Sequence, residues 1–285
     1  MRDEKPGVFV MIVVLSALTN LAIILYFISI YRAVTVSPGR IPRCAPWNNI
    51  DEKEAKNLAE SKRSGGLRFC RWCRSMKPDR AHHCRVCDAC TLKMDHHCPW
   101  LDNCIGFGNH KFFLLTLWYS SVSLLLMSAS CGWLGYYLMH STSLLGVDMG
   151  RLVIGVLVSA VAGLVGLLIS AFFGIHVSLI LRGVTTLEVF EKNRGGNDEC
   201  GLLCCEMKDP VTRKRGRNTY QLPSCIENIK AAVGDDAWFW FIPTMPLRKT
   251  GSPDGLHYQL SAHLDRKAVE EGADSPLLPG IHDTT

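Results

Sequence analysis

Three long apolar stretches place this chain among membrane proteins. They cover residues 8–31, 112–139 and 152–181, and none of them contains Asp, Glu, Lys or Arg. Each exceeds the roughly 20 residues that an α-helix needs to cross a bilayer. We therefore expect an all-α integral membrane bundle with three transmembrane helices. A cleaved signal peptide is the alternative for the first stretch, but the stretch is long for such a segment and lacks a clear small-x-small cleavage site.

The distribution of basic residues predicts how these helices are oriented. Residues 32–111 are rich in Lys and Arg, whereas residues 140–150 contain neither. Because cytoplasmic loops carry the excess of basic residues, we expect residues 32–111 in the cytosol and, two helices later, the C-terminal region on the same side. Contact with anionic lipids explains the formal net charge of +5 without a nucleic-acid partner. The sequence predicts a multi-pass protein of an endomembrane (Golgi or ER) or of the plasma membrane, with membrane lipids as partners.

The loop between the first two stretches holds most of the chain's 13 cysteines. It contains two copies of the pattern C-x2-C-x9-H-x6-C, and a shift of fourteen residues superimposes one copy on the other. Three thiolates and one imidazole form a closed tetrahedral zinc shell that leaves no position for water or substrate. We therefore expect two structural zinc ions. The expected ligands are Cys70, Cys73, His83 and Cys90 for one ion, and Cys84, Cys87, His97 and Cys104 for the other.

One cysteine inside the second copy belongs to neither ligand set. Cys98 lies three residues after Asp95 and two residues after His96. A thiolate is the reactive form of cysteine, a nearby imidazole can take the thiol proton, and a carboxylate can fix the tautomer of that imidazole. The equivalent position of the first copy has Ala81 in place of the aspartate. We therefore expect Cys98 as the nucleophile, His96 as its base and Asp95 as the residue that orients the base.

These residues resemble those of the DHHC family of integral-membrane protein S-acyltransferases. The likeness covers most of residues 64–113. It implies that Cys98 takes a long-chain acyl group such as palmitoyl from acyl-CoA and passes it to cysteines of cytosolic-face substrate proteins. It also implies the same roles for His96 and Asp95, and zinc binding by His97. The likeness continues after the nucleophile through Pro99, Trp100, Asn103, Cys104, Ile105, Gly106, Asn109, Phe112 and Phe113.

Further positions gain a role through this resemblance. Lys77 and Arg80 are by themselves loop charges near a lipid surface, and the resemblance implies that they contact the phosphates of coenzyme A. Trp100 is by itself an interfacial side chain, and the matching family residue lies where the acyl chain enters. The T-T-x-E string around Thr186 is alone a weak helix cap, and the family places this threonine on the active-site aspartate. Asn228 falls in a stretch that resembles the family's C-terminal motif.

The chain departs from the family in one respect. Family members usually have two helices before the cysteine-rich loop and this chain has one, so we expect the first family helix, which helps to wall the acyl-binding cavity, to be missing. The expected organisation is a transmembrane helix (8–31), a cytosolic linker (32–63), the cysteine-rich catalytic domain (64–111), two transmembrane helices (112–139 and 152–181), a cytosolic juxtamembrane region (182–248) and a disordered tail (249–285).

Two other functions are compatible with a zinc-binding loop. A catalytically weak or inactive membrane adaptor would need the eight ligands but neither Asp95, His96 nor an unligated Cys98, and all three are present. A nucleic-acid-binding zinc finger would need a recognition helix, and this loop is instead tethered to the membrane at both ends. The sequence therefore favours a ping-pong protein-cysteine S-palmitoyltransferase with acyl-CoA as co-substrate, and the adaptor is the alternative.

Overall fold

The computed structural model describes residues 6–43, 47, 60, 68–141, 149–193, 207–208, 215–216, 220–248 and 254–258. The chain forms two compact units, and each is built from segments that are far apart in the sequence. The first, here called the membrane unit, comprises residues 1–35, 111–177 and 238–245. The second, here called the hairpin unit, comprises residues 36–110, 178–237 and 246–285.

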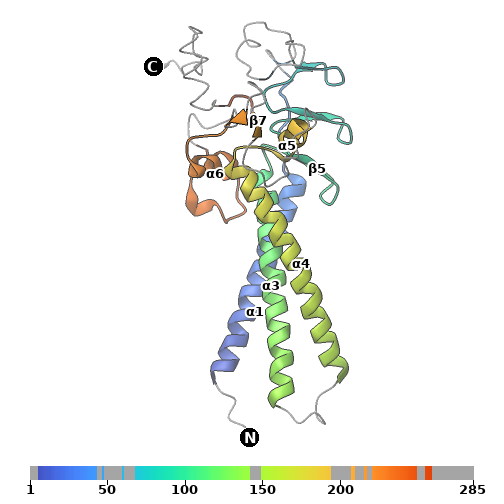
Figure 1. Cartoon of the computed structure of the whole chain (residues 1–285), viewed down its shortest axis with the longest axis vertical. Helices are drawn as coiled ribbons and strands as arrows, with labels where there is room; N and C mark the ends of the chain where they lie inside the picture. The colour runs from blue at the N-terminus through green and yellow to red at the C-terminus, as the bar shows by residue number, and fades with distance from the viewer. Residues whose placement is uncertain are drawn as a thin grey trace. The chain divides into compact units, whose positions relative to one another are not determined.

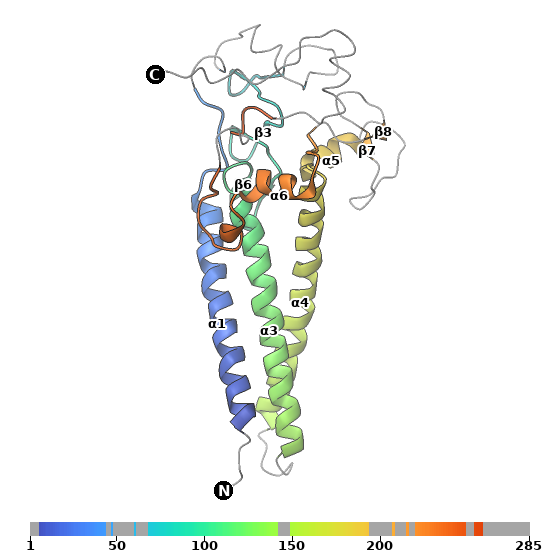
Figure 2. The same ribbon diagram turned by 90° about the vertical axis from the view of Figure 1, so that its left-hand side faces the viewer.

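The three helices expected from the apolar stretches are present. They are α1 (Pro6–Thr35), α3 (His110–Ser141) and α4 (Met149–Leu181), and they run side by side (Figure 1; Figure 2). All three are long and apolar enough to cross a membrane. Each begins a few residues before its apolar stretch, because the helical hydrogen bonding continues into flanking residues.

The two helices α3 and α4 pack against each other through small residues. Ser128 and Ser159 each donate a hydrogen bond from Oγ to the backbone carbonyl of the other, at 2.8 Å in both cases. The Oγ atoms of Ser121 and Ser170 lie 2.5 Å apart. A Cβ atom added to Gly163 would lie 2.8 Å from Oγ of Ser128, so a larger residue there would require the Ser128 side chain to shift. Small side chains thus allow the two helices to pack closely.

Three short antiparallel hairpins lie in the described part of the hairpin unit. In Figure 1 they lie one above another at the upper right. Each has the same register, since the cysteine that ends the first strand pairs with the residue that begins the second. The hairpins are β1 (Phe69–Cys70) with β2 (Ser75–Met76), β3 (His82–Cys84) with β4 (Ala89–Thr91), and β5 (His96–Cys98) with β6 (Asn103–Ile105).

The turns of the three hairpins are alike as well. The residue just before the second strand has a positive φ in each, at 51° for Arg74, 46° for Asp88 and 45° for Asp102. The three residues are spaced fourteen apart, which is the spacing of the two ligand patterns. The structural repeat therefore extends over a third hairpin, although only two copies of the ligand pattern exist.

Two short helices also belong to the hairpin unit, and both are capped by side chains. α5 (Thr186–Asn193) follows a reciprocal cap. The backbone N of Glu188 donates to Oγ1 of Thr185 at 3.3 Å, and the backbone N of Thr185 donates to Oε2 of Glu188 at 2.9 Å. This is the capping box that the T-T-x-E string predicts. α6 (Cys225–Val233) begins after Ser224, whose side chain accepts a backbone N–H of the first turn.

The amide of Asn228 joins α6 to the end of α4. Its Nδ2 donates to the carbonyl of Leu181 at 3.3 Å and to that of Ser224 at 3.1 Å, and its Oδ1 accepts from the backbone N of Leu222 at 3.1 Å. Beside it, Gly183 has a φ of 65°, and a Cβ there would lie 2.9 Å from Oδ1 of Asn228. The position therefore requires glycine.

The remaining elements of the described residues are β7 (Met207–Lys208), its partner β8 (Arg215–Gly216) and the 3-10 helix η2 (Ala237–Phe239).

Two expected segments fall largely outside the described residues. Of the cytosolic linker at 32–63, the structure describes residues 32–43, 47 and 60. Of the tail at 249–285, which the sequence predicts to be disordered, it describes residues 254–258. Those five residues form a turn that packs on the hairpin unit, which differs from the expectation for the tail.

Candidate metal centres and active site

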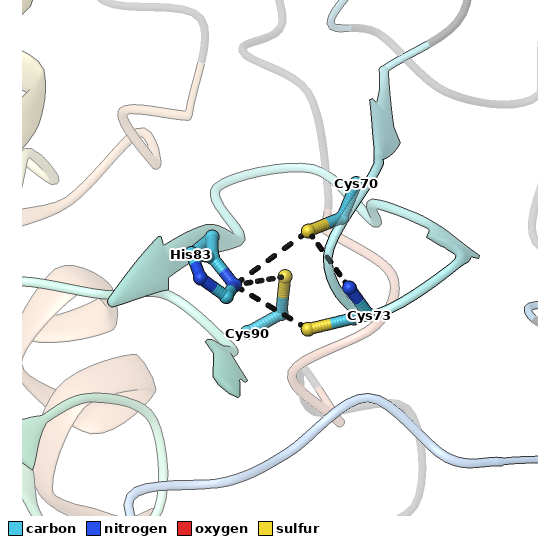
Figure 3. Close-up of side chains that lie close together, drawn as sticks. All are labelled: Cys70, Cys73, His83 and Cys90. Atoms are coloured by element: carbon cyan, nitrogen blue, oxygen red, sulfur yellow. Dashed lines mark hydrogen bonds between the residues drawn. The ribbon is translucent and has the colours of Figure 1, made fainter. Parts of the chain in front are cut away.

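The first expected ligand group comes together in the structure. Nδ1 of His83 lies 3.6 Å from Sγ of Cys70, 3.4 Å from that of Cys73 and 3.9 Å from that of Cys90. All four side chains point toward one common centre (Figure 3). Zinc–sulfur and zinc–nitrogen bonds of normal length place the ligand atoms of a tetrahedral site about 3.5–3.8 Å apart. The group could therefore hold a metal ion, and its donor set suits zinc.

The second group has the same geometry. Nδ1 of His97 lies 3.7 Å from Sγ of Cys84, 3.4 Å from that of Cys87 and 3.8 Å from that of Cys104. The sulfurs of Cys87 and Cys104 are 3.6 Å apart. These separations again fit a tetrahedral ion. Among the residues that the structure describes, two Cys/His clusters could thus hold metal ions, in the pairing expected from the sequence.

Strand geometry explains why the two clusters interleave. Successive side chains of a strand point to opposite faces, so on β3 His83 and Cys84 point in different directions. The histidine joins the first cluster and the cysteine joins the second. Register supplies one further ligand to each, because His83 pairs with Cys90 and His97 pairs with Cys104 across their hairpins. One strand therefore contributes to both clusters.

The cysteine that follows the second cluster's histidine lies outside both clusters. Cys98 is a free thiol and only 6% exposed. On β5 it lies two residues from His96, so both side chains are on one face of the strand, while His97 between them points to the metal cluster. The fold therefore places this thiol on the strand face of His96 and outside both ligand groups.

A buried carboxylate connects that imidazole to α5. Oδ2 of Asp95, a residue only 2% exposed, lies 2.7 Å from Nδ1 of His96. Thr186 donates from its backbone N to Oδ1 of Asp95 at 2.7 Å and from its Oγ1 to Oδ2 at 2.9 Å. A carboxylate in this position accepts the proton on Nδ1 of a neutral imidazole, which leaves the basic lone pair on Nε2. The arrangement can remove a proton from a thiol.

Comparison with known proteins identifies this region. The family model described as DHHC palmitoyltransferase matches residues 63–193. These residues belong to the DHHC family. Both metal clusters, Asp95, His96, Cys98 and Thr186 fall inside the matched range, so the whole arrangement described above is part of the DHHC domain.

Curated relatives of this chain carry palmitoyltransferase names. Palmitoyltransferase pfa3 of Neurospora crassa is 40% identical over 181 residues, which are 61% of this chain and 29% of that protein. Palmitoyltransferase ZDHHC2 of Rattus norvegicus is 36% identical over 207 residues, 72% of this chain and 51% of that protein. Palmitoyltransferase PFA3 of Yarrowia lipolytica is 29% identical over 228 residues, 78% of this chain and 56% of that protein. The chain thus spans about a third to a half of the length of these relatives.

The structure places one expected substrate contact of the DHHC domain in another environment. Arg80 is only 4% exposed, and its contact with the phosphates of coenzyme A stays a prediction. Its Nε and Nη2 lie 2.6 and 2.9 Å from the two carboxylate oxygens of Glu188, and Nη2 also donates to the carbonyl of Gly183 at 2.9 Å. Burial alone would lower the pKa of this guanidinium, but Glu188 raises it above its usual value. The charge of Arg80 therefore holds α5 in place.

The other expected residues lie as follows. Lys77 is half-buried, and its backbone N donates to the carbonyl of Arg68 at 2.7 Å. Trp100 lies in the turn of the hairpin β5–β6 and is 91% exposed. Asn228 holds α6 against the end of α4. The structure therefore brings Thr186 to Asp95, and the expected substrate contacts remain predictions.

One basic residue of the domain was not singled out by its sequence. Lys93 follows the last ligand of the first metal cluster, Cys90, and precedes His97 of the second, and it has a left-handed conformation with a φ of 43°. It lines a small cavity of about 30 Å³ together with Arg80 and Tyr258. Burial, and next the positive charges of Arg80 and Arg248, lower the pKa of Lys93 to about 7. Its neighbours come from distant segments, so no local pattern indicates this environment.

Proposed function

We propose that this chain is a protein S-acyltransferase that transfers a long-chain acyl group, palmitoyl in particular, from acyl-CoA to cysteines of substrate proteins. The observation that carries the proposal is the free, buried Cys98 on the same strand face as His96, which is paired with Asp95. The printed names of the relatives support palmitoyl as the group. We therefore assign Cys98 as nucleophile, His96 as general base and Asp95 as the residue that orients it.

The reaction has two steps with one covalent intermediate. In the first, His96 accepts the thiol proton of Cys98, the sulfur attacks the thioester carbonyl of acyl-CoA, and the bond to the CoA sulfur breaks. The CoA thiolate leaves with the proton from His96. In the second step a substrate cysteine gives its proton to His96 and attacks the acyl-Cys98 thioester. Cys98 leaves as a thiolate and regains its proton, so the enzyme is unchanged.

Two zinc ions would hold the catalytic hairpin in this reaction. Each closed four-ligand shell fixes one cross-strand histidine–cysteine pair, His83 with Cys90 and His97 with Cys104. A closed shell has no open position for substrate, so the ions supply folding energy and take no part in the transfer. The rigid strand β5 then presents His96 and Cys98 to the substrate.

The membrane supplies the remaining context of the proposal. The hairpin unit would face the cytosol, where acyl-CoA and substrate proteins are present, because basic residues flank it. Trp100, at 91% exposure, would lie where the acyl chain enters, and Lys77 would contact the phosphates of coenzyme A. Asn228 would support the site by holding α6.

Acyl labelling tests the proposal directly. Purified protein given labelled palmitoyl-CoA should form a hydroxylamine-sensitive thioester on Cys98, and Cys98→Ser should abolish it. Cys225→Ser is the matched control, because Cys225 is an exposed free cysteine outside the site, and it should label normally. Zinc content should be unchanged in both variants, which separates loss of chemistry from loss of fold. Equal labelling of Cys98→Ser and the parent protein would remove the assignment and leave a membrane adaptor with a zinc module.

A further inference from the structure

Residues 254–258, here called the C-terminal turn, pack on the hairpin unit. Oδ1 of Asp254 accepts hydrogen bonds from the backbone N of Leu256 at 2.8 Å and of His257 at 2.7 Å, which close the turn. Gly255 has a φ of 89°, and a Cβ there would lie 2.8 Å from Cδ1 of Phe107. The turn therefore approaches Phe107 as closely as a glycine allows.

The last residue of the C-terminal turn covers the buried arginine of the DHHC domain. The guanidinium carbon of Arg80 lies 5.3 Å from the ring centre of Tyr258 and 4.8 Å from that of Tyr220. The hydroxyl of Tyr258 donates to the carbonyl of Gly255 within the turn, at 3.2 Å. Burial raises the pKa of Tyr258, so the phenol stays neutral. Arg80 therefore contacts the aromatic ring of Tyr258, whereas the hydroxyl of Tyr258 stabilises the turn.

Arg80 is joined to the catalytic imidazole through three short links. It forms a bidentate ion pair with Glu188. Glu188 caps the start of α5 by accepting from the backbone N of Thr185. The next residue, Thr186, gives two hydrogen bonds to Asp95, which holds His96. Each link involves a buried or partly buried polar group, so a continuous set of contacts connects Arg80 with the donors that hold Asp95.

We propose that Tyr258 is a positioning residue for acyl transfer, acting through Arg80, Glu188 and Thr186 on Asp95. Its ring covers the arginine and excludes water from the ion pair with Glu188, and a dry ion pair is held more tightly than a hydrated one. Tyr258 lies outside residues 63–193 that match the family model. The inference rests on the proposed function, since it assigns a role in that reaction.

Replacing the ring tests the inference. Single-turnover acylation of Cys98 is measured in the full-length protein over a range of palmitoyl-CoA concentrations. Tyr258→Ala should lower the maximal rate about tenfold, while the concentration that gives half of it stays unchanged, because the loss concerns orientation of the base. Tyr258→Phe keeps the ring and should stay within about twofold of the parent protein. Equal rates for Tyr258→Ala and a parent protein that labels normally would overturn the inference, as would an equally slow Tyr258→Phe.

A double-mutant cycle separates positioning from general destabilisation. Thr186→Val and Tyr258→Ala act on the same carboxylate, so their combined effect on the rate should be well below the product of the single effects. A combined effect equal to the product of the two single effects would contradict the proposed link. Zinc content and the thermal midpoint are followed in each variant. If Tyr258→Ala loses zinc, Tyr258→Leu is measured instead, since leucine keeps the bulk of the side chain without an aromatic face. Tyr258→Leu should slow acylation as much as is expected for Tyr258→Ala. A normal rate for Tyr258→Leu would overturn the inference. Absence of any thioester in the parent protein would instead refute the proposed function.

Discussion

The hairpins β3–β4 and β5–β6 share one register and differ in their chemistry. In each, two histidines precede the cysteine that ends the first strand, and the second histidine joins a metal cluster. The cysteines differ, because Cys84 joins the second cluster whereas Cys98 joins neither of the two. The comparison indicates that Cys98, the proposed nucleophile, occupies a metal-ligand position whose shell is incomplete.

The sequence explains why the third shell is incomplete. A further shift by fourteen residues keeps a cysteine at the first ligand position, Cys98. The other three ligand positions then carry side chains that are not among the usual zinc ligands, namely Leu101, Lys111 and Trp118. The third hairpin thus keeps the geometry of a zinc-binding hairpin, but its thiol belongs to neither Cys/His cluster.

The first histidines of the two hairpins differ as well. His82 follows Ala81, which is fully buried, and burial together with the charge of Arg68 lowers the pKa of His82 to about 3. His96 follows Asp95 and is paired with its carboxylate. One residue, alanine or aspartate, therefore decides whether the histidine of an otherwise equal hairpin has a carboxylate to orient it.

The largest expected effect is on the metal clusters. Cys84→Ser should lower the zinc content from about two ions to about one per chain and abolish acylation, because a structural site that loses a thiolate ligand no longer holds β3. The matched variant at the same hairpin position, Cys98→Ser, should keep both ions. Metal analysis of the purified proteins measures the difference. Equal zinc loss in the two variants would show that the two cysteines are equivalent, against the comparison.

The next effect concerns the aspartate that distinguishes the hairpins. Asp95→Asn should lower the acylation rate by about 10³–10⁴-fold, because an amide can donate to the imidazole and favour the wrong tautomer. Zinc content should not change, since Asp95 is in neither cluster. Single-turnover labelling measures the rate. A loss of less than about tenfold would mean that the carboxylate is not needed to orient the base.

A smaller effect is expected from the threonine that holds this aspartate. Thr186→Val removes the hydroxyl donor at 2.9 Å and keeps the backbone donor at 2.7 Å. We expect the acylation rate to fall about tenfold, which corresponds to about 1.4 kcal/mol for one hydrogen bond to a charged group. Thr186→Ser keeps the hydroxyl and should retain most of the rate. Equal rates for the two variants would exclude a contribution of the hydroxyl.

The smallest effect is a pH dependence of stability. In the fourteen-residue repeat Lys93 occupies the position that corresponds to Asp79. The pKa of Lys93 is lowered from 10.5 to about 7. Between these values the unfolded chain holds a proton that the folded protein has lost, so this residue makes stability rise with pH across the window. Lys93→Met should raise the melting temperature in detergent by a few degrees at pH 6–7, and the gain should vanish above about pH 10. A gain that does not depend on pH would exclude titration of Lys93 as its cause.

Local spacing predicted much of the fold and of the site. The apolar stretches predicted the three helices, and the repeat predicted how eight ligands divide into two clusters, because a strand and a tight turn fix which side chains meet. Contacts between segments that are distant in the sequence were harder to predict. The pairing of Thr186 with Asp95 was expected through the family likeness alone, and the ion pair of Arg80 with Glu188 joins residues 108 apart in the sequence. No local pattern indicates that Tyr258 covers this arginine.

Native mass spectrometry of the intact protein tests most directly whether Cys98 lies outside both metal shells. After incubation with palmitoyl-CoA, single chains should carry two zinc ions and one hydroxylamine-sensitive acyl group at the same time, with the group on Cys98 by peptide mapping. Acyl groups found only on chains that have lost a zinc ion would contradict this, because the modified cysteine would then have been a metal ligand.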